Sequence, residues 1–246
     1  MKHFKLIALL VFSFNLLFAQ QENEEFKCLE KVKTYCKKVG NMQVPAAKQV
    51  YSFKYNMTLA YWDSVAQPVV NQDVQIKISR DYREFITAKA EYYHDNLNLV
   101  VVAKDIKSVF VSPSTLAKSQ DNTMGSANMF RDTLFTLYKS LKLTTYVDEN
   151  KRTIQRLEIF ILDEYKSAVG VNKMVYHYCP AENRVVKSEV FYNASNAKKY
   201  EVVTIKEEQY TSSEKVGKNA YKKVFAKKGV LNAKYKGYKI IDKNSK

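Results

Sequence analysis

The sequence has few glycines, prolines and cysteines: six, four and three in 246 residues. No apolar run reaches the ~18–20 residues that a membrane-spanning helix needs. These scarcities exclude collagen, a disulfide-stapled miniprotein and a glycine-rich phosphate-binding loop. Tyrosine and phenylalanine are abundant, with 18 and 13 residues, in a chain that is 46% hydrophobic. This composition also excludes a disordered chain.

The net charge of +15 is unevenly distributed along the chain. Residues 215–246 contain 11 lysines and one acidic residue, Asp242, and therefore carry +10. Lys2 and Lys5 add +2, so that the remainder is nearly balanced at +3. The excess charge belongs to a basic C-terminal extension and not to the whole chain.

Residues 1–19 have the pattern of a secretory signal peptide. Lys2 and Lys5 precede the short apolar stretch 6–18, and the small residue Ala19 follows it. A buried N-terminal helix is the alternative interpretation. No cysteine follows the expected cleavage point, so we expect a periplasmic protein that is not lipid-anchored. Removal of the signal leaves 227 residues, enough for one large domain.

Strands are predicted by apolar residues that recur every second position. From Tyr51 to Tyr61 every odd position is apolar, and the even positions from Ser52 to Thr58 are polar. This alternation predicts a long antiparallel strand with one buried face. Further strands are expected at 74–78, 86–93, 97–103, 108–112, 143–147, 153–162, 173–179, 185–192, 200–205 and 238–242.

Two helices are predicted by apolar residues at helical spacing. The first covers 26–39 and ends at Gly40, and the second runs from Phe130 to Leu141 after a polar loop at 113–125. Asp163 and Glu164 are expected in a solvated loop.

Strands and helices do not alternate as they would in a parallel α/β fold. The expected fold is mainly β with a few helices: a curved antiparallel sheet or unclosed β-barrel, with an N-terminal helix and a mid-chain lid helix. We expect one domain at 20–214, followed by the basic extension 215–246.

Catalytic and metal-binding signatures are missing from the sequence. It contains no GxSxG, P-loop or GxGxxG motif. His94 lies in an expected turn and His177 in an expected strand, and neither belongs to a CxxC or HExxH pattern. We therefore expect no catalysis, no cofactor and no metal. A hydrolase with a dispersed Ser-His-Asp triad is a minor alternative.

The three cysteines leave two interpretations open. Cys28 and Cys36 lie eight residues apart on the first helix, about 12 Å along its axis, and so cannot form a disulfide with each other. Either of them pairs with Cys179, or all three remain thiols.

An apolar cavity is one consequence of many strands and few helices. If the sheet curls, its inner face either is filled by its own side chains or leaves a cavity. A cavity lined by such residues, without convergent charge, suits an acyl chain. The candidate lining residues are Phe53, Tyr55, Met57, Leu59, Ile76, Ile78, Leu99, Val101, Leu157, Ile159, Met174 and Tyr176.

The order of elements resembles that of a known family, the periplasmic outer-membrane lipoprotein carrier proteins (LolA-like family). The most specific stretch is Asp73 to Ser112, DVQIKISRDYREFITAKAEYYHDNLNLVVVAKDIKSVFVS. The later segment that begins LEIFILDEYK is similar in layout to the second half of the family. The similarity lies in the pattern of elements and covers most of the mature chain.

This resemblance implies an unclosed β-barrel whose helices form a lid over an apolar cavity that accepts lipoprotein acyl chains. The arginine that tethers the lid in the family corresponds to Arg80 or Arg83. Asn96 stands where the family has a turn glycine, and the extension from Lys215 is longer and more basic than in the family.

The basic extension has two interpretations. Lys222, Lys223, Lys227 and Lys228 alternate with aromatic residues, and in the cell envelope they would contact anionic lipid or lipopolysaccharide. Alternatively, the segment is extended and solvated, and ends in a strand at 238–242 that pairs with the sheet edge. Export makes nucleic acid an improbable partner.

The sequence therefore predicts a monomeric periplasmic carrier of lipid or lipoprotein acyl chains. The alternative is a non-enzymatic scaffold or interaction protein of the envelope with a filled core.

Overall fold

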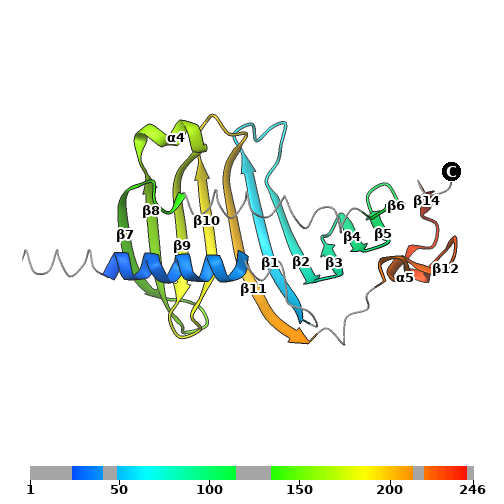
Figure 1. The fold of residues 1–246 in the computed structure, drawn as a ribbon. Coiled ribbons are helices and arrows are strands. Elements are labelled where there is room, and N and C mark those ends of the chain that lie inside the picture. Colours follow the sequence, from blue (N-terminus) through cyan, green and yellow to red (C-terminus); the bar gives the residue numbers. More distant parts are fainter. Residues whose placement is uncertain (1–23, 41–48, 115–133, 213–218, 243–246) are drawn as a thin grey trace, which may run out of the picture.

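The computed structural model describes residues 24–40, 49–114, 134–212 and 219–242 (Figure 1). Helix 24–40 comes first in the chain. The later elements are β1 Gln49–Tyr61, β2 Val70–Ser79, β3 Tyr82–Ile86, β4 Ala90–Asp95, β5 Asn98–Ala103, β6 Ser108–Pro113, β7 Tyr138–Val147, β8 Thr153–Ile161, α4 Asp163–Val169, β9 Val171–Cys179, β10 Arg184–Tyr192, β11 Lys198–Ser212, α5 Ala220–Val224, β12 Phe225–Lys227, β13 Val230–Leu231, η2 Ala233–Tyr235 and β14 Lys239–Asp242.

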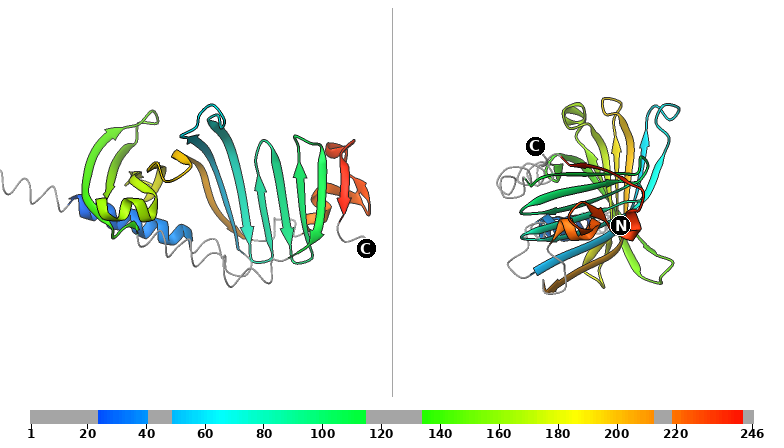
Figure 2. Two further views of the ribbon diagram at one scale, coloured as in Figure 1. Left: turned by 90° about the horizontal axis from the view of Figure 1, so that it is seen from above. Right: turned by 90° about the vertical axis from the view of Figure 1, so that its right-hand side faces the viewer.

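Twelve of the strands form one sheet in the order β14-β6-β5-β4-β3-β2-β1-β11-β10-β9-β8-β7. The sheet is not closed into a barrel, since β14 and β7 are its two edges. It twists strongly, so that β4 to β6 cross β8 to β10 when the molecule is viewed from its C-terminal end (Figure 2). The predicted fold class, a mainly β unclosed sheet with an N-terminal and a mid-chain helix, is confirmed.

Strand β1 lies at the centre of the sheet and has the predicted alternation. It pairs antiparallel with both β2 and β11 along its length. Residues directly opposite each other in a pair point to the same face. Phe53 lies opposite Ile76 on one side and Glu208 on the other, so these three side chains share one face.

Helix 24–40 packs on that face of the sheet, which we call the helix face. It lies across β7 to β11 (Figure 1). At its start the Glu25 carboxylate accepts a hydrogen bond from the Leu143 amide of β7 (3.2 Å), and towards its end the Tyr35 hydroxyl donates to Glu208 of β11 (2.8 Å). Cys28, Leu29 and other helix residues form a buried core with the helix face of β8 and β9.

Residues 220–242 pack at the other end of the sheet (Figure 1). They cover the face opposite to the helix face. Ala220, Val224, Phe225 and Tyr235 form a core with valines and tyrosines of β3 to β6 that alternate with the residues of the helix face. The last strand, β14, pairs parallel with β6 at the sheet edge. This part of the basic extension is therefore folded onto the domain.

A buried carboxylate attaches this segment to β4. Glu91 is 2% exposed. It accepts hydrogen bonds from Lys234 (2.8 Å) and from the hydroxyls of Tyr235 and Tyr93, and it forms an ion pair with Lys104 (3.0 Å). A buried charge of this kind is tolerated only when it is paired and hydrogen-bonded, as it is here.

Two predicted elements are wrong. The strand expected at 86–93 is divided into β3 and β4, because the Thr87 hydroxyl accepts a hydrogen bond from the Ala90 amide (3.0 Å) and forms a turn. The helix predicted from Phe130 to Leu141 is also wrong at its C-terminal end, because residues 138–141 belong to β7. The start of this predicted helix lies in residues 115–133, outside the described part of the chain. Tertiary pairing of residues 138–141 with β8 outweighs their helical pattern.

The mid-chain helix that the structure describes is α4, between β8 and β9. It begins at Asp163, which was expected in a loop, and ends at Gly170 in the left-handed conformation (φ 69°). No helix in the described ranges has the length and hydrophobicity required to cross a membrane.

The cysteines form no disulfide between described residues. Cys28 lies in the core under the helix, whereas Cys179 lies with Ile154 and Val186 in a separate cluster. Cys179 follows Tyr178, which belongs to the helix-face core, so its side chain points to the opposite face of the sheet. The sheet therefore separates the two thiols.

The buried Glu91 contacts predict a large effect on stability. Replacing Glu91 with alanine leaves the buried hydroxyls of Tyr93 and Tyr235 without their acceptor and removes the partner of Lys104 and Lys234. We expect the free energy of unfolding to fall by about 2–4 kcal/mol. As control, Asp163→Ala removes exposed ion pairs to Lys139 and Lys166, for which we expect a much smaller effect, because solvent screens exposed charges. Urea unfolding measures both, and equal effects would contradict the role of Glu91.

The same contacts predict a pH dependence. Burial alone would raise the pKa of Glu91, but its hydrogen bonds lower it from 4.5 to about 2. Because the folded pKa is depressed, the contribution of Glu91 to stability is present above pH 4.5 and is lost as the pH falls towards 2. The stability difference between the wild type and Glu91→Gln should therefore shrink over this interval. A difference that stays constant would contradict the assignment.

Candidate functional site

A continuous apolar row crosses the helix face of β1 to β6. The strand registers place one residue of each strand directly beside the next. The row consists of Phe53, Ile76, Phe85, Tyr92, Val101 and Phe110. None of the six is fully buried, and Tyr92 is 41% exposed. In contrast, Leu157, Ile159 and Met174 on the helix face of β8 and β9 are at most 2% exposed, because helix 24–40 covers them.

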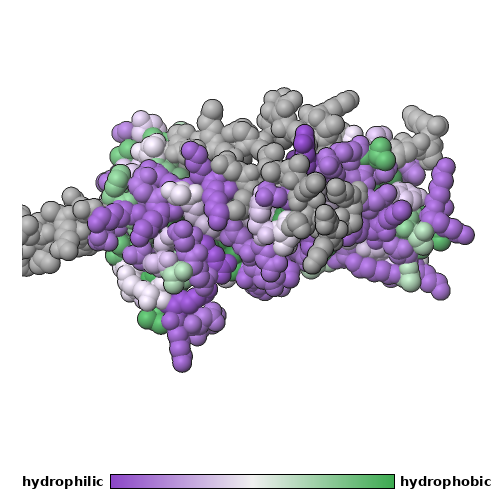
Figure 3. Space-filling model, turned by 60° about the horizontal axis from the view of Figure 1, so that its bottom comes forward, coloured by the Kyte–Doolittle hydropathy of each residue, from purple (hydrophilic) through white to green (hydrophobic). Residues whose placement is uncertain are grey.

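A pocket of about 390 Å³ lies on this row. Its apolar walls are Ile76, Ile78, Phe85, Tyr92 and Leu99, and its polar lining is Arg83, Glu84 and His94. On the face shown in Figure 3, by comparison, hydrophobic residues occur only in small groups on a mostly hydrophilic surface. An open concave surface of this composition suits an apolar ligand with one polar end.

Arg83 and His94 lie side by side in the register of β3 and β4, and both line this pocket. Burial lowers the pKa of the Arg83 guanidinium. The pKa of His94 is also lowered, by burial and then by the nearby Arg83 charge. His94 is therefore neutral at pH 7, and Arg83 supplies the positive charge.

The histidines do not form a catalytic triad with described residues. His94 Nε2 lies 2.9 Å from the Ser114 hydroxyl, but no described carboxylate hydrogen-bonds to its other ring nitrogen. His177 is buried on the opposite face, between Glu189 (2.9 Å) and the Tyr146 hydroxyl (2.9 Å), and burial lowers its pKa. No group of three metal-binding side chains occurs in the part of the chain that the structure describes.

The structure divides the predicted lining residues into two sets. Those on the open half of the helix face are Phe53, Tyr55, Met57, Leu59, Ile76, Ile78, Leu99 and Val101, and of these Ile76, Ile78 and Leu99 line the pocket. Those in the core under helix 24–40 are Leu157, Ile159, Met174 and Tyr176. The side chains of the second set pack against other residues of the core, helix 24–40 included, and so do not line an open cavity.

The two candidate tether arginines are also separated. Arg83 lines the pocket, whereas Arg80 is exposed in the turn between β2 and β3. Four pocket residues were missed from the sequence: Glu84, Phe85, Tyr92 and His94. Once the strand expected at 86–93 is divided at Thr87, the alternation from Tyr82 onwards places Phe85 on the helix face.

The four lysines proposed for an anionic surface differ in their surroundings. Lys222, Lys227 and Lys228 are exposed. Lys223 is half-buried and its ammonium lies 3.5 Å from the buried Glu84 carboxylate. One of the four therefore has an internal electrostatic partner.

Comparisons with known proteins yield structural matches only. No family model matches the chain, and no curated protein matches its sequence. LprF from Mycobacterium bovis is 8% identical, with 80% of this chain and 96% of that chain covered and a TM-score of 0.39. Lipoprotein LppX from Mycobacterium tuberculosis is 10% identical, with 74% and 97% covered and a TM-score of 0.37.

A LolA superfamily protein from Nitrosomonas europaea is 12% identical, with 74% of this chain and 90% of that chain covered and a TM-score of 0.27. All three are distant structural similarities, with TM-scores below 0.4, and one of them is to a protein of the superfamily that the sequence was predicted to resemble.

Proposed function

We propose that the protein is a periplasmic carrier that holds acyl chains of a lipid or lipoprotein on the helix face of β1 to β6, without catalysis. The observation that supports this proposal best is the apolar row from Phe53 to Phe110. It lies on the same face as the core under helix 24–40, yet its side chains are only partly buried. Export follows from the signal-like residues 1–19, which lie outside the described part.

The energetics of the row favour an acyl chain over a polar ligand. Each methylene that leaves water contributes about 0.8 kcal/mol, so about eight methylenes contribute roughly 6 kcal/mol. A polar ligand would lose hydrogen bonds to water along most of this surface, since Arg83, Glu84 and His94 are the polar residues among those that line the pocket. Arg83, beside the row on β3, would donate hydrogen bonds to a carbonyl oxygen of the bound acyl chains.

The exposed lysines of residues 220–242 would bring the carrier to anionic membrane or lipopolysaccharide surfaces. Lys222, Lys227 and Lys228 point away from the core formed with β3 to β6. Each lysine near an anionic membrane contributes about 1 kcal/mol. This contact is electrostatic and therefore would weaken as salt is added.

Native mass spectrometry of the gently extracted protein tests the acyl-chain proposal. We expect co-purified lipid with the wild type and its loss from Ile76→Asp, because a carboxylate in the middle of the row must stay hydrated. Gln75→Asp is the matched control, since Gln75 is the preceding residue of β2 and faces the other side of the sheet. We expect this variant to keep its lipid.

Two results would contradict the acyl-chain proposal. One is a wild type that carries no lipid and binds none when it is added. The other is an equal loss of lipid from both variants while both remain folded by circular dichroism. A filled core together with a protein partner that survives delipidation would instead favour an envelope scaffold.

A further inference from the structure

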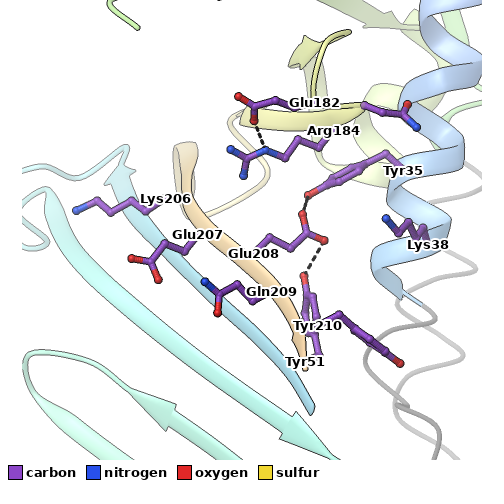
Figure 4. A pocket seen from close by; sticks show the side chains of 11 residues that line it. Tyr35, Lys38, Tyr51, Glu182, Arg184, Lys206, Glu207, Glu208, Gln209 and Tyr210 are labelled. Atoms are coloured by element: carbon purple, nitrogen blue, oxygen red, sulfur yellow. Dashed lines mark hydrogen bonds and ion pairs between the residues drawn. The ribbon is translucent and has the colours of Figure 1, made fainter. Parts of the chain in front are cut away.

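A second, polar pocket of about 450 Å³ opens where helix 24–40 meets β11 (Figure 4). It is lined from the helix, from β1 and β11, and from the turn between β9 and β10. The Glu208 side chain lies at its centre, between the hydroxyls of Tyr35 and Tyr51 (Figure 4). The pocket combines aromatic surface with charges of both signs.

Two tyrosine hydroxyls of the described part of the chain hold the Glu208 carboxylate. The carboxylate accepts hydrogen bonds from Tyr35 (2.8 Å) and, at the longer distance of 3.5 Å, from Tyr51. Burial and the Glu208 charge raise the pKa of both phenols, so that both remain neutral donors. Two neutral hydroxyls orient the carboxylate but do not neutralise its charge.

The absence of a cation beside Glu208 distinguishes it from comparable residues of the sheet. Glu208 is half-buried, and no described lysine, arginine or histidine lies within 4.0 Å of its carboxylate. Five other buried or half-buried glutamates each have a lysine within 3.5 Å. These are Glu84, Glu91, Glu158, Glu189 and Glu201.

Glu201 gives the closest comparison with Glu208. It lies on the same face of β11, and its carboxylate also accepts a hydrogen bond from a tyrosine hydroxyl, that of Tyr192 (3.3 Å). Unlike Glu208, it is paired with a lysine, Lys198 (2.9 Å). Among the described residues, Glu208 therefore has no lysine partner of the kind that Glu201 has.

The polar pocket is continuous with the apolar row. Tyr51 lines the pocket, and its ring stacks on Phe53, the first residue of the row, with 5.8 Å between ring centroids. Glu208 is directly opposite Phe53 in the β1–β11 register. A ligand lying along the row would therefore end at Glu208.

The positive charges of the pocket are at its rim. Arg184 is paired with Glu182, and Lys206 is paired with Asp73 (2.8 Å). Lys38 is exposed and forms no ion pair with a described residue. Glu208 and Lys38 thus offer one negative and one positive charge that are not balanced within the pocket.

We propose that this pocket binds the headgroup of a zwitterionic phospholipid, with the ammonium group at Glu208 between Tyr35 and Tyr51 and the phosphate towards Lys38. An ammonium group is attracted both to a carboxylate and to aromatic rings. The inference rests on the proposed function, because it places the headgroup of the lipid whose acyl chains occupy the row.

Binding assays with two lipids of identical acyl chains test the headgroup site. We expect the wild type to bind phosphatidylethanolamine at least about tenfold more tightly than phosphatidylglycerol, which has no ammonium group. Glu208→Gln should remove this preference and leave the affinity for phosphatidylglycerol unchanged. Glu201→Gln, the matched control, should keep the preference.

Soluble phosphoethanolamine separates this inference from the proposed function. It has no acyl chain, so its binding to the wild type, and not to Glu208→Gln, would support the headgroup site even if no lipid bound to the row. Equal affinity of the wild type for the two lipids, or a preference unaffected by Glu208→Gln, would overturn the headgroup site. In either case, acyl-chain binding that is lost in Ile76→Asp would leave the proposed function standing.

Discussion

The length of helix 24–40 limits how many strands of the sheet it can cover, and the rest of the structure depends on this limit. Helix 24–40 is about 25 Å long at 1.5 Å per residue, and neighbouring strands are about 4.8 Å apart. A helix laid across the strands therefore covers about five of them, and helix 24–40 extends from the Leu143 amide on β7 to Glu208 on β11. The apolar pattern of the helix face does not stop there. It continues over β1 to β6, where the side chains are partly exposed and the pocket is found.

The C-terminal segment covers a different apolar surface, at the other end of the sheet. There the opposite face of β3 to β6 is apolar, and residues 220–242 cover it. Two lysines of the segment, Lys223 and Lys234, meet buried carboxylates of β3 and β4. Part of the basic extension therefore forms ion pairs within the protein. Its exposed lysines are the ones that can contact an external anionic surface.

The sequence was sufficient to predict the fold class, because alternation over a long strand such as β1 is a strong signal. It was insufficient where a single side chain decides a turn. The Thr87 hydroxyl forms a turn between β3 and β4, and this turn brings Phe85 and Tyr92 beside each other on one face, whereas alternation along a single strand would place them on opposite faces. Leu141 was placed in a helix because its spacing fits one, whereas pairing with β8 makes it part of a strand.

The candidate site was predictable only in part for a related reason. Alternation shows that Ile76 and Leu157 both face one side of the sheet, but not which of them lies beneath the helix. The polar pocket was not predictable at all, because Tyr35, Tyr51 and Glu208 are brought together from three distant segments. Such a site depends on strand order, which local patterns do not contain.

The central claim is that the open half of the helix face holds an acyl chain. Photocrosslinking with a fatty acid that carries a diazirine in its chain, followed by peptide mapping, tests it most directly. We expect adducts on the helix face of β2 to β5, at residues such as Ile76, Phe85 and Tyr92, and we expect excess unlabelled lipid to suppress them. Adducts confined to residues 220–242 or to β7, or adducts that unlabelled lipid does not suppress, would contradict it.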